Sequence, residues 1–231
     1  MNYLFDIDGT LTPPRQPMQK EFKKFFAGWI IEKRKRNSKV FLVTGSDRQK
    51  TVEQIGLSLW RFVDGSYQNC GNQLYIRGQL VKQSKWKISP YLRLDILTSI
   101  EKSPFYGDAK QNIEERAGMV NISAIGRGAT EKQRQNYYRW DKESREREGI
   151  IKELSSKYPN LEFSIGGEIS IDIYPKGKDK SQALSDMVGR TTFFGDKCKE
   201  GNDYHISRKS NKYYNVRSWE ETYRILKRGG V

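Results

Sequence analysis

Cysteine and histidine are scarce in this chain. Its 231 residues include two cysteines, Cys70 and Cys198, and one histidine. The cysteines show no metal-ligand spacing, and their positions alone do not indicate a disulfide. The chain has no apolar run near the roughly 18 residues of a membrane-spanning helix. Its start, MNYLFDIDG, lacks the charged and apolar parts of a signal peptide. We therefore expect a soluble, cytoplasmic protein without a membrane partner.

Acidic residues are fewer than basic ones. The 28 Asp and Glu are outnumbered by 42 Lys and Arg, which gives a net charge of +14. This balance favours an anionic partner, such as nucleic acid, a membrane surface or a phosphorylated metabolite, although a basic soluble surface without a partner also fits. The most basic run, EKRKRNSK at 32–39, falls at an expected helix end, where cations favour the helix dipole. It therefore gives little support to a dedicated nucleic-acid site.

The N-terminal part of the chain alternates between strand and helix patterns. The expected elements are strands at 2–6 and 40–47, each followed by a helix, at 22–30 and 48–57. This alternation predicts a parallel sheet with crossover helices. In such sheets, ligands bind beyond the carboxyl ends of the strands.

The pattern changes in the middle of the chain. The elements expected there are a helix at 90–101, short strands within 112–127, a long polar helix at about 131–156 and two strands within 161–174. A buried strand returns at 191–197, and an amphipathic helix at 218–227 closes the chain. The expected fold is therefore α/β: a Rossmann-like core with a parallel sheet, made of residues 1–81 and 175–231, interrupted by an α+β cap domain at 82–174.

Residues with oxygen or nitrogen groups that can bind a metal or a phosphate follow three of the expected strands. They are Asp6 and Asp8 after the first strand, Thr44, Gly45 and Ser46 after the second, and Asp196 after TTFFG, with Asp203 in the next loop and Lys180 at the start of the preceding helix. Carboxylates from adjacent strands could bind Mg²⁺, which prefers oxygen ligands. The hydroxyl, amides and ammonium would neutralise phosphate oxygens. Turn aspartates that merely cap helices are the alternative, and four ordered elements weaken it.

These elements resemble the four motifs of the haloacid dehalogenase-like (HAD) superfamily of phosphotransferases. The matching segments, in order, are FDIDGTLT (5–12), VTGSD (43–47), Lys180 and FFGDK…GND (193–203). The resemblance implies that Asp6 is the nucleophile, which forms an aspartyl phosphate, and that Asp8 is the general acid/base. It also implies phosphate binding by Gly45, Ser46 and Lys180, and Mg²⁺ binding by Asp6, Asp8, Asp196 and Asp203.

Other segments resemble the eukaryotic-type phosphomannomutases within that superfamily. They are DGTLTPPRQ (8–16), RAGMVNISAIGR (116–127), FSIGGEISIDIYPKGKDK (163–180) and FFGDKCKEGNDY (193–204). This resemblance implies that the substrate's phosphates bind Arg15, Arg116, Arg127 and Arg134, and its sugar hydroxyls Ser170 and Asp172. It further implies a hexose phosphate substrate, most readily mannose, a hexose 1,6-bisphosphate as activator and a homodimer formed through the caps.

The chain departs from the family pattern at several positions. Ala117 follows Arg116 where the family has asparagine, NCG (69–71) replaces ENG, KGKDK (176–180) replaces DGWDK, and Glu168 replaces glutamine. The loop from Asp196 to Asp203 is one residue shorter. The segment HISRKSN (205–211) lacks the acidic residue that holds a second, structural cation in these mutases. We therefore expect one Mg²⁺ rather than two.

Three functions remain open from the sequence. A mutase would pass phosphate between positions 1 and 6 of a hexose through Asp6, inside a cap that excludes water. A HAD phosphatase would use the same aspartates and let water attack. A nucleic-acid end phosphatase or basic binding module would use the positive charge and the aromatic run YYRWDK (137–142). The arginines of the cap favour the mutase.

Overall fold

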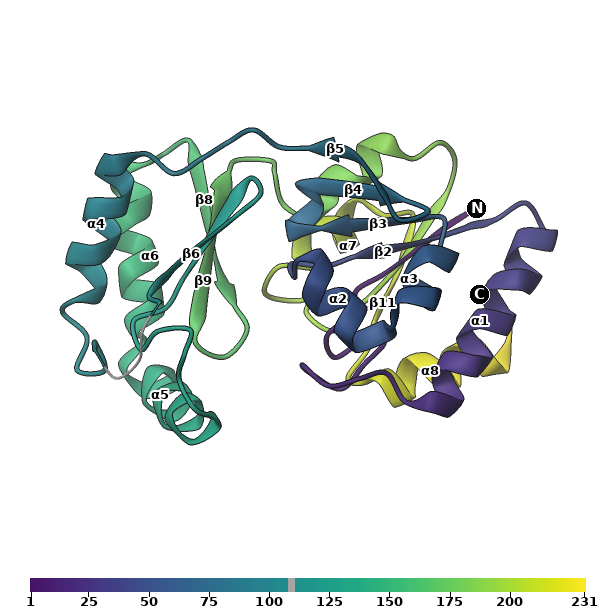
Figure 1. Ribbon diagram of the computed structural model, residues 1–231, viewed down its shortest axis with the longest axis horizontal. Helices are drawn as coiled ribbons and strands as arrows, with labels where there is room; N and C mark the ends of the chain where they lie inside the picture. The colour runs from purple at the N-terminus through teal and green to yellow at the C-terminus, as the bar shows by residue number, and fades with distance from the viewer. Residues whose placement is uncertain (108–110) are drawn as a thin grey trace. The chain divides into compact units, whose positions relative to one another are not determined.

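The structure is a computed structural model that describes residues 1–107 and 111–231 (Figure 1). It divides into two compact units: the core unit, Met1–Gln83 with Lys178–Val231, and the cap unit, Ser84–Gly177. These boundaries lie two and three residues after the two that the sequence predicts. Each unit has its own sheet and its own apolar cluster. None of the helices in the described ranges combines the length and hydrophobicity needed to cross a bilayer.

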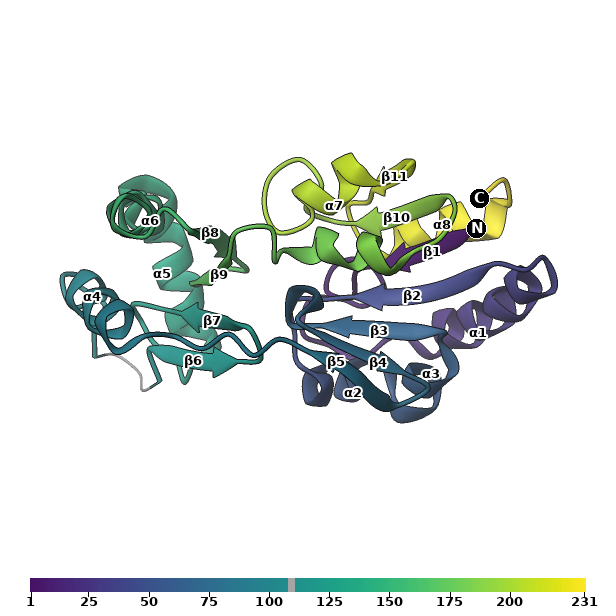
Figure 2. The ribbon, with the colours of Figure 1, turned by 90° about the horizontal axis from the view of Figure 1, so that it is seen from above.

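The core unit contains a seven-stranded sheet in the order β11-β10-β1-β2-β3-β4-β5. The strands from β11 to β3 run parallel, as Figure 2 shows, and β4 and β5 extend the sheet with antiparallel pairings. This arrangement confirms the expected α/β fold. The elements of the core are β1 (Asn2–Phe5), α1 (Lys20–Lys35), β2 (Lys39–Val43), α2 (Arg48–Ile55), α3 (Leu57–Phe62), β3 (Gly65–Gln68), η1 (Asn69–Gly71), β4 (Gln73–Ile76), β5 (Gln79–Gln83), η2 (Lys180–Asp186), β10 (Thr191–Gly195), α7 (Tyr204–Lys209), β11 (Lys212–Asn215) and α8 (Trp219–Arg228).

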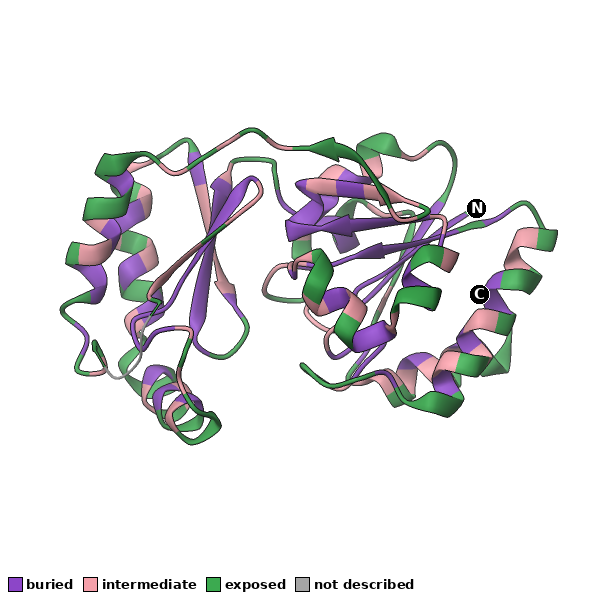
Figure 3. Cartoon of the chain, in the orientation of Figure 1, coloured by how far each residue is buried: buried purple, intermediate pink, exposed green. Residues whose placement is uncertain are grey.

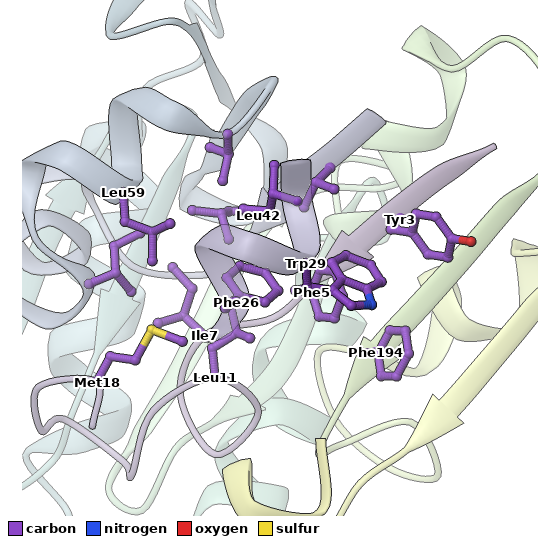
Figure 4. Close-up of a cluster of buried hydrophobic side chains, with 14 of the residues drawn as sticks. Tyr3, Phe5, Ile7, Leu11, Met18, Phe26, Trp29, Leu42, Leu59 and Phe194 are labelled. Atoms are coloured by element: carbon purple, nitrogen blue, oxygen red, sulfur yellow. The ribbon is translucent and has the colours of Figure 1, made fainter. Parts of the chain in front are cut away.

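The core sheet is covered on both faces, since every residue of its central strands β1 and β10 is buried. On one face, Phe5 packs edge-on against Phe26 of α1 and stacks on Phe194 of β10, with 4.7 Å between the stacked rings. The next residue along β1, Leu4, belongs to a different cluster that includes Ile206 of α7. Helices α1, α3 and α8 therefore pack on one face, in the cluster that Figure 4 shows, and α7 packs on the other. Figure 3 shows the buried strands of the sheet in purple.

The cap unit has a four-stranded antiparallel sheet in the order β6-β7-β9-β8. One face of this sheet is apolar: Ile122 lies opposite both Ile113 and Ile171, and all three belong to the cluster that the cap helices cover. The other face is polar, since Asn121 lies opposite both Glu114 and Asp172. The elements of the cap are α4 (Pro90–Ile100), β6 (Ile113–Arg116), β7 (Met119–Ile122), α5 (Glu131–Ser144), α6 (Glu146–Lys157), β8 (Leu161–Gly166) and β9 (Ser170–Pro175).

Two predictions of secondary structure need correction. The single polar helix expected at 131–156 is two helices, α5 and α6, because Arg145 between them is left-handed, with φ +53°. The Asp141 carboxylate accepts the Arg147 amide at 2.9 Å, so a side chain of α5 fixes the start of α6. The structure also contains strands β3, β4 and β5, which the sequence did not predict.

Candidate active site

The sheet order brings three functional loops together. β10, β1 and β2 are parallel neighbours, so their carboxyl ends share one edge of the sheet. Asp196 directly follows β10, Asp6 follows β1, and Thr44 follows β2. Ser46 is buried in the loop after β2, where its amide donates to Thr44 Oγ1 at 3.0 Å. The edge predicted to carry the site is therefore the edge where these side chains lie.

Lys180 connects two of the expected site residues. Its Nζ donates to Asp6 Oδ1 at 2.6 Å and to Asp203 Oδ1 at 2.7 Å. All three side chains are buried, with 1% of Lys180, 5% of Asp6 and 0% of Asp203 exposed. The lysine stands at a defined helix start. η2 begins at Lys180, and Asp179 caps this helix by accepting the Ser181 amide at 2.6 Å.

The cluster contains three carboxyl groups, of Asp6, Asp196 and Asp203, and one ammonium group, of Lys180. Burial raises the pKa of Asp6 well above its ordinary value; Lys180 opposes that effect, and Asp203 and Asp196 add to it. Burial together with Asp203 raises the pKa of Asp196 to about 6. Burial alone would lower the pKa of Lys180, but Asp203 and Asp6 outweigh burial and hold it well above the usual value. A permanent ammonium therefore stands among three carboxylates.

The cluster fits a divalent cation. Carboxylate oxygens of Asp6, Asp196 and Asp203 lie within 4.8 Å of one another. Hard cations such as Mg²⁺ take oxygen ligands from one or two carboxylates together with water and phosphate. These three residues could therefore hold the metal, and its charge would relieve the repulsion that raises the pKa of Asp6 and Asp196.

Helix capping does not account for these aspartates. Asp47 and Asp179 are true caps, since each carboxylate accepts a backbone amide at the start of the helix that follows. Asp203 stands at the N-cap position of α7 but makes no cap hydrogen bond with its side chain. Its carboxylate contacts Lys180 and accepts the Lys197 amide at 3.2 Å instead. The structure thus separates capping aspartates from those of the cluster.

Asp8 has different surroundings from Asp6. Its Oδ1 accepts the Arg15 amide at 2.7 Å and Gln54 Nε2 at 2.8 Å, and its Oδ2 lies 3.6 Å from Lys50 Nζ. Burial would raise the pKa of Asp8, but Lys50 and these hydrogen bonds outweigh it and lower that pKa. The Asp8 carboxylate is therefore directed at these groups, and the acidic group that could hold a metal does not include it. The Arg15 side chain, expected to bind phosphate, is exposed.

Gln54 and Lys50 contact Asp8 but were not among the site residues that the sequence predicted. Both belong to α2, which follows the VTGSD motif, and they are four residues apart, so they share one face of the helix. Gln54 is 5% exposed and also donates to Thr12 Oγ1 at 3.2 Å. The spacing within RQKTVEQI was the signal that could have identified them.

Gly9 allows the close approach of the loops that follow β1 and β10. Its φ is +76°, and a Cβ at this position would lie 2.6 Å from Asp196 Oδ2. We expect Gly9→Ala to destabilise the protein by about 1–3 kcal/mol and to weaken metal binding, because the methyl group would displace the Asp196 carboxylate. Thermal unfolding at increasing Mg²⁺ concentration measures both effects.

Gly177 provides a matched control for this substitution. Its φ is +75°, and a Cβ there would meet no atom within 4 Å. Gly177→Ala should therefore carry the backbone strain without affecting the metal response. Equal Mg²⁺ responses of the two variants would contradict the role assigned to Gly9.

The polar face of the cap sheet carries the expected sugar-binding residues. Ser170 and Asp172 are two residues apart on β9 and therefore face the same side, and both are buried. Asp172 Oδ1 accepts Asn121 Nδ2 at 2.6 Å. The three expected phosphate-binding arginines of the cap contact carboxylates: Arg116 and Arg127 contact Glu114, at 2.8 and 2.9 Å, and Arg134 Nε lies 3.9 Å from Glu168.

Several solved structures have a similar fold. A sugar phosphatase of HAD subclass IIB aligns with a TM-score of 0.61 and 15% identity over 98% of each chain. A Streptococcus mutans protein aligns with a TM-score of 0.67 and 12% identity, covering 98% of this chain and 97% of its own. At these identities the likeness concerns the fold alone. The fold, a parallel-sheet core with an inserted second unit, is similar to that of this HAD sugar phosphatase.

Sequence relatives identify the family more closely. The profile described as eukaryotic phosphomannomutase matches residues 27–228. Phosphomannomutase of Saccharomyces cerevisiae is 35% identical over 96% of this chain and 91% of its own length. Phosphomannomutase of Encephalitozoon cuniculi is 33% identical, over 96% and 90%. The chain belongs to the eukaryotic phosphomannomutase family, a family of phosphohexomutase-type enzymes.

Proposed function

We propose that this protein is a Mg²⁺-dependent phosphomannomutase that interconverts mannose 1-phosphate and mannose 6-phosphate through a phosphoaspartate at Asp6. The single observation that carries the proposal is the buried Asp6–Lys180–Asp203 cluster, with Asp196 in reach, at the edge where β1 and β10 end. Membership in the family supports the choice of substrate. A hexose 1,6-bisphosphate would phosphorylate the resting enzyme.

Lys180 prepares Asp6 for attack on phosphorus. The ammonium binds Oδ1 of Asp6, so Oδ2 is the oxygen that we assign to the attack. Its positive charge favours the ionised form of Asp6 and so opposes the rise in pKa that burial causes. The metal, held by Asp6, Asp196 and Asp203, would neutralise phosphate charge. Attack transfers the phosphoryl group to Oδ2 and breaks its bond to the sugar oxygen.

Asp8 is suited to move the proton. Its hydrogen bonds and Lys50 lower its pKa, so the resting form is the carboxylate. In that form Asp8 can accept the proton of a sugar hydroxyl as this hydroxyl attacks the phosphoaspartate. In the reverse direction, the same proton returns to the sugar oxygen that leaves. A mutase uses both directions, because the bisphosphate formed in one step donates its other phosphate in the next.

Mg²⁺ is expected to stabilise the folded protein. The three carboxylates that could hold it exist as a group only in the folded state, so binding favours that state, by about 2.7 kcal/mol at a concentration 100 times the dissociation constant. Asp196→Asn should remove most of the increase in Tm that Mg²⁺ produces. Asp186→Asn, at an acid that contacts Lys82 outside this group, is the control and should keep the increase. An unchanged Mg²⁺ response of Asp196→Asn would contradict the assignment.

Product analysis tests the proposed reaction. The enzyme is incubated with mannose 1-phosphate, Mg²⁺ and a catalytic amount of hexose 1,6-bisphosphate, and phosphorus NMR follows the products. Mannose 6-phosphate without an equal amount of inorganic phosphate is the expected result. Inorganic phosphate as the main product would mean that water reaches the phosphoaspartate and that the enzyme is a phosphatase. Binding of single-stranded nucleic acid that falls steeply with salt, without sugar-phosphate turnover, would favour the nucleic-acid function.

A homodimer through the cap and a cytoplasmic location remain part of this proposal. The dimer is supported by two exposed apolar side chains on α4, Tyr91 and Leu94, which are 81% and 63% exposed. They are three residues apart and so share one face of the helix, and apolar side chains that form a contiguous patch mark surfaces that contact another protein.

A further inference from the structure

Glu114 contacts two of the three arginines of the cap that are expected to bind phosphate. Its Oε1 accepts Arg116 Nε at 2.9 Å, its Oε2 accepts Arg116 Nη2 at 2.8 Å, and Oε2 also lies 2.9 Å from Arg127 Nε. The pair with Arg116 is therefore bidentate, the geometry that fixes a guanidinium plane most firmly. Burial would raise the pKa of Glu114, but the two arginines outweigh burial and lower it, so the carboxylate is ionised.

The same residue is aligned with the expected sugar-binding side chains. Glu114 lies directly opposite Asn121, and Asn121 lies directly opposite Asp172. Residues opposite one another in antiparallel strands share a face of the sheet. Asn121 also donates a hydrogen bond to Asp172. One row across three strands thus links the carboxylate that holds the arginines to the carboxylate expected to accept sugar hydroxyls.

We infer that Glu114 is a positioning residue, which holds Arg116 and Arg127 together as one receptor for a phosphate of the sugar phosphate. This inference rests on the proposed function for the identity of the ligand, and it deepens that proposal by adding a residue that would not itself touch the phosphate.

The burial of the two arginines is the physical reason for such a residue. Only 12% of the Arg116 side chain and 19% of the Arg127 side chain are exposed. Two cations with so little water around them repel each other unless an anion neutralises them, and removing the anion leaves buried charge without compensation. Without Glu114, the two guanidinium groups would turn toward water, and phosphate binding would have to order them again. With Glu114, both side chains are already ordered before phosphate binds, so binding does not carry that entropic cost.

Glu114→Gln tests the inference, because it removes the charge and keeps the shape of the side chain. We expect the KM for mannose 1-phosphate to rise about tenfold, which corresponds to about 1.4 kcal/mol, with kcat changed less than about twofold. Glu114→Asp, which keeps the charge on a shorter side chain, should recover part of the loss. An unchanged or lower KM for Glu114→Gln would overturn the inference, the lower value because it would mean that Glu114 competes with phosphate.

Glu115→Gln is the matched control. Glu115 is the next residue on β6, is exposed and pairs with Arg93 rather than with the expected phosphate-binding arginines. The same charge change at this position should leave KM unaltered. An equal rise in KM for both variants would show a general effect of charge on the cap and would also overturn the inference.

A second readout does not depend on turnover. The Nε–H NMR signals of Arg116 and Arg127 are followed while inorganic phosphate is added to the wild-type protein and to Glu114→Gln. Weaker phosphate binding at these signals in the variant supports the positioning role, and equal binding overturns it. If the wild type fails to interconvert hexose phosphates, the proposed function fails, and this titration still tests Glu114.

Discussion

Replacing Lys180 by methionine is expected to destabilise the protein by about 3–5 kcal/mol, the usual effect of removing one partner from a buried ion pair. The ammonium is the hydrogen-bond donor for both Asp6 Oδ1 and Asp203 Oδ1, and its side chain is 1% exposed. Methionine would fill a similar volume but would leave two buried carboxylates facing each other. Since whole domains are stable by about 5–15 kcal/mol, this is a large fraction. Denaturant unfolding in metal-free buffer measures it.

The same substitution should also change the activity and the effect of Mg²⁺ on stability. Lys180→Met should lose phosphoryl transfer, because nothing then holds Asp6 Oδ1. Mg²⁺ should restore part of the lost stability, since it supplies positive charge to the same carboxylates. Lys178→Met, two residues earlier at an exposed position, is the control and should unfold like the wild type. Equal unfolding midpoints for the Lys180 and Lys178 variants would contradict the arrangement described for the cluster.

Asp6→Asn is expected to abolish transfer without destabilising the fold. As the proposed nucleophile, Asp6 cannot be replaced by a neutral amide, and a loss of roughly 10⁴-fold or more in kcat is the usual result for such residues. Burial raises the pKa of Asp6 in the folded protein. The folded state therefore holds the Asp6 proton more tightly than the unfolded state does. Stability is lost as pH rises from the unfolded pKa, about 3.9, through the folded one.

The pH dependence gives this variant a distinctive signature. In metal-free buffer near neutral pH, Asp6→Asn should unfold at the same denaturant concentration as the wild type or at a higher one. The difference should shrink as the pH falls through the unfolded pKa and vanish well below it, at about pH 3, where Asp6 is protonated in both states. An active Asp6→Asn enzyme would rule out Asp6 as the nucleophile. A much less stable variant would mean that the pair with Lys180 outweighs the burial of Asp6.

The sequence predicted the parts of the structure where strong local signals agree. Strands β1, β2 and β10 are apolar runs that end in acidic or hydroxyl residues, so both the strands and the acids at their ends could be located. Parallel neighbours then place those ends together. The polar face of the cap was also accessible in part, because Glu114 and Arg116 are two residues apart on one strand and must share a face.

The remainder depends on contacts between distant residues. Strand β3 reads GSYQ, which has no apolar alternation, yet all four residues are buried because β2 and β4 flank it. The helix break at Arg145 lies within a run of good helix formers, so helix propensity does not predict it. In the structure, the contact between Asp141 and Arg147 spans the break. The contact of Glu114 with Arg127 requires the fold of the loop after β7. No local pattern carries that information.

Trapping the phosphorylated enzyme is the most direct test of the account. The protein is mixed with Mg²⁺ and hexose 1,6-bisphosphate carrying radioactive phosphorus, quenched in acid and digested, and the labelled peptide is identified by mass spectrometry. We predict label on the N-terminal peptide at Asp6, no label in Asp6→Asn, and transfer of the label to mannose 1-phosphate or mannose 6-phosphate when these are added before the quench. Label on another residue, or its release only as inorganic phosphate, would contradict a mutase that works through Asp6.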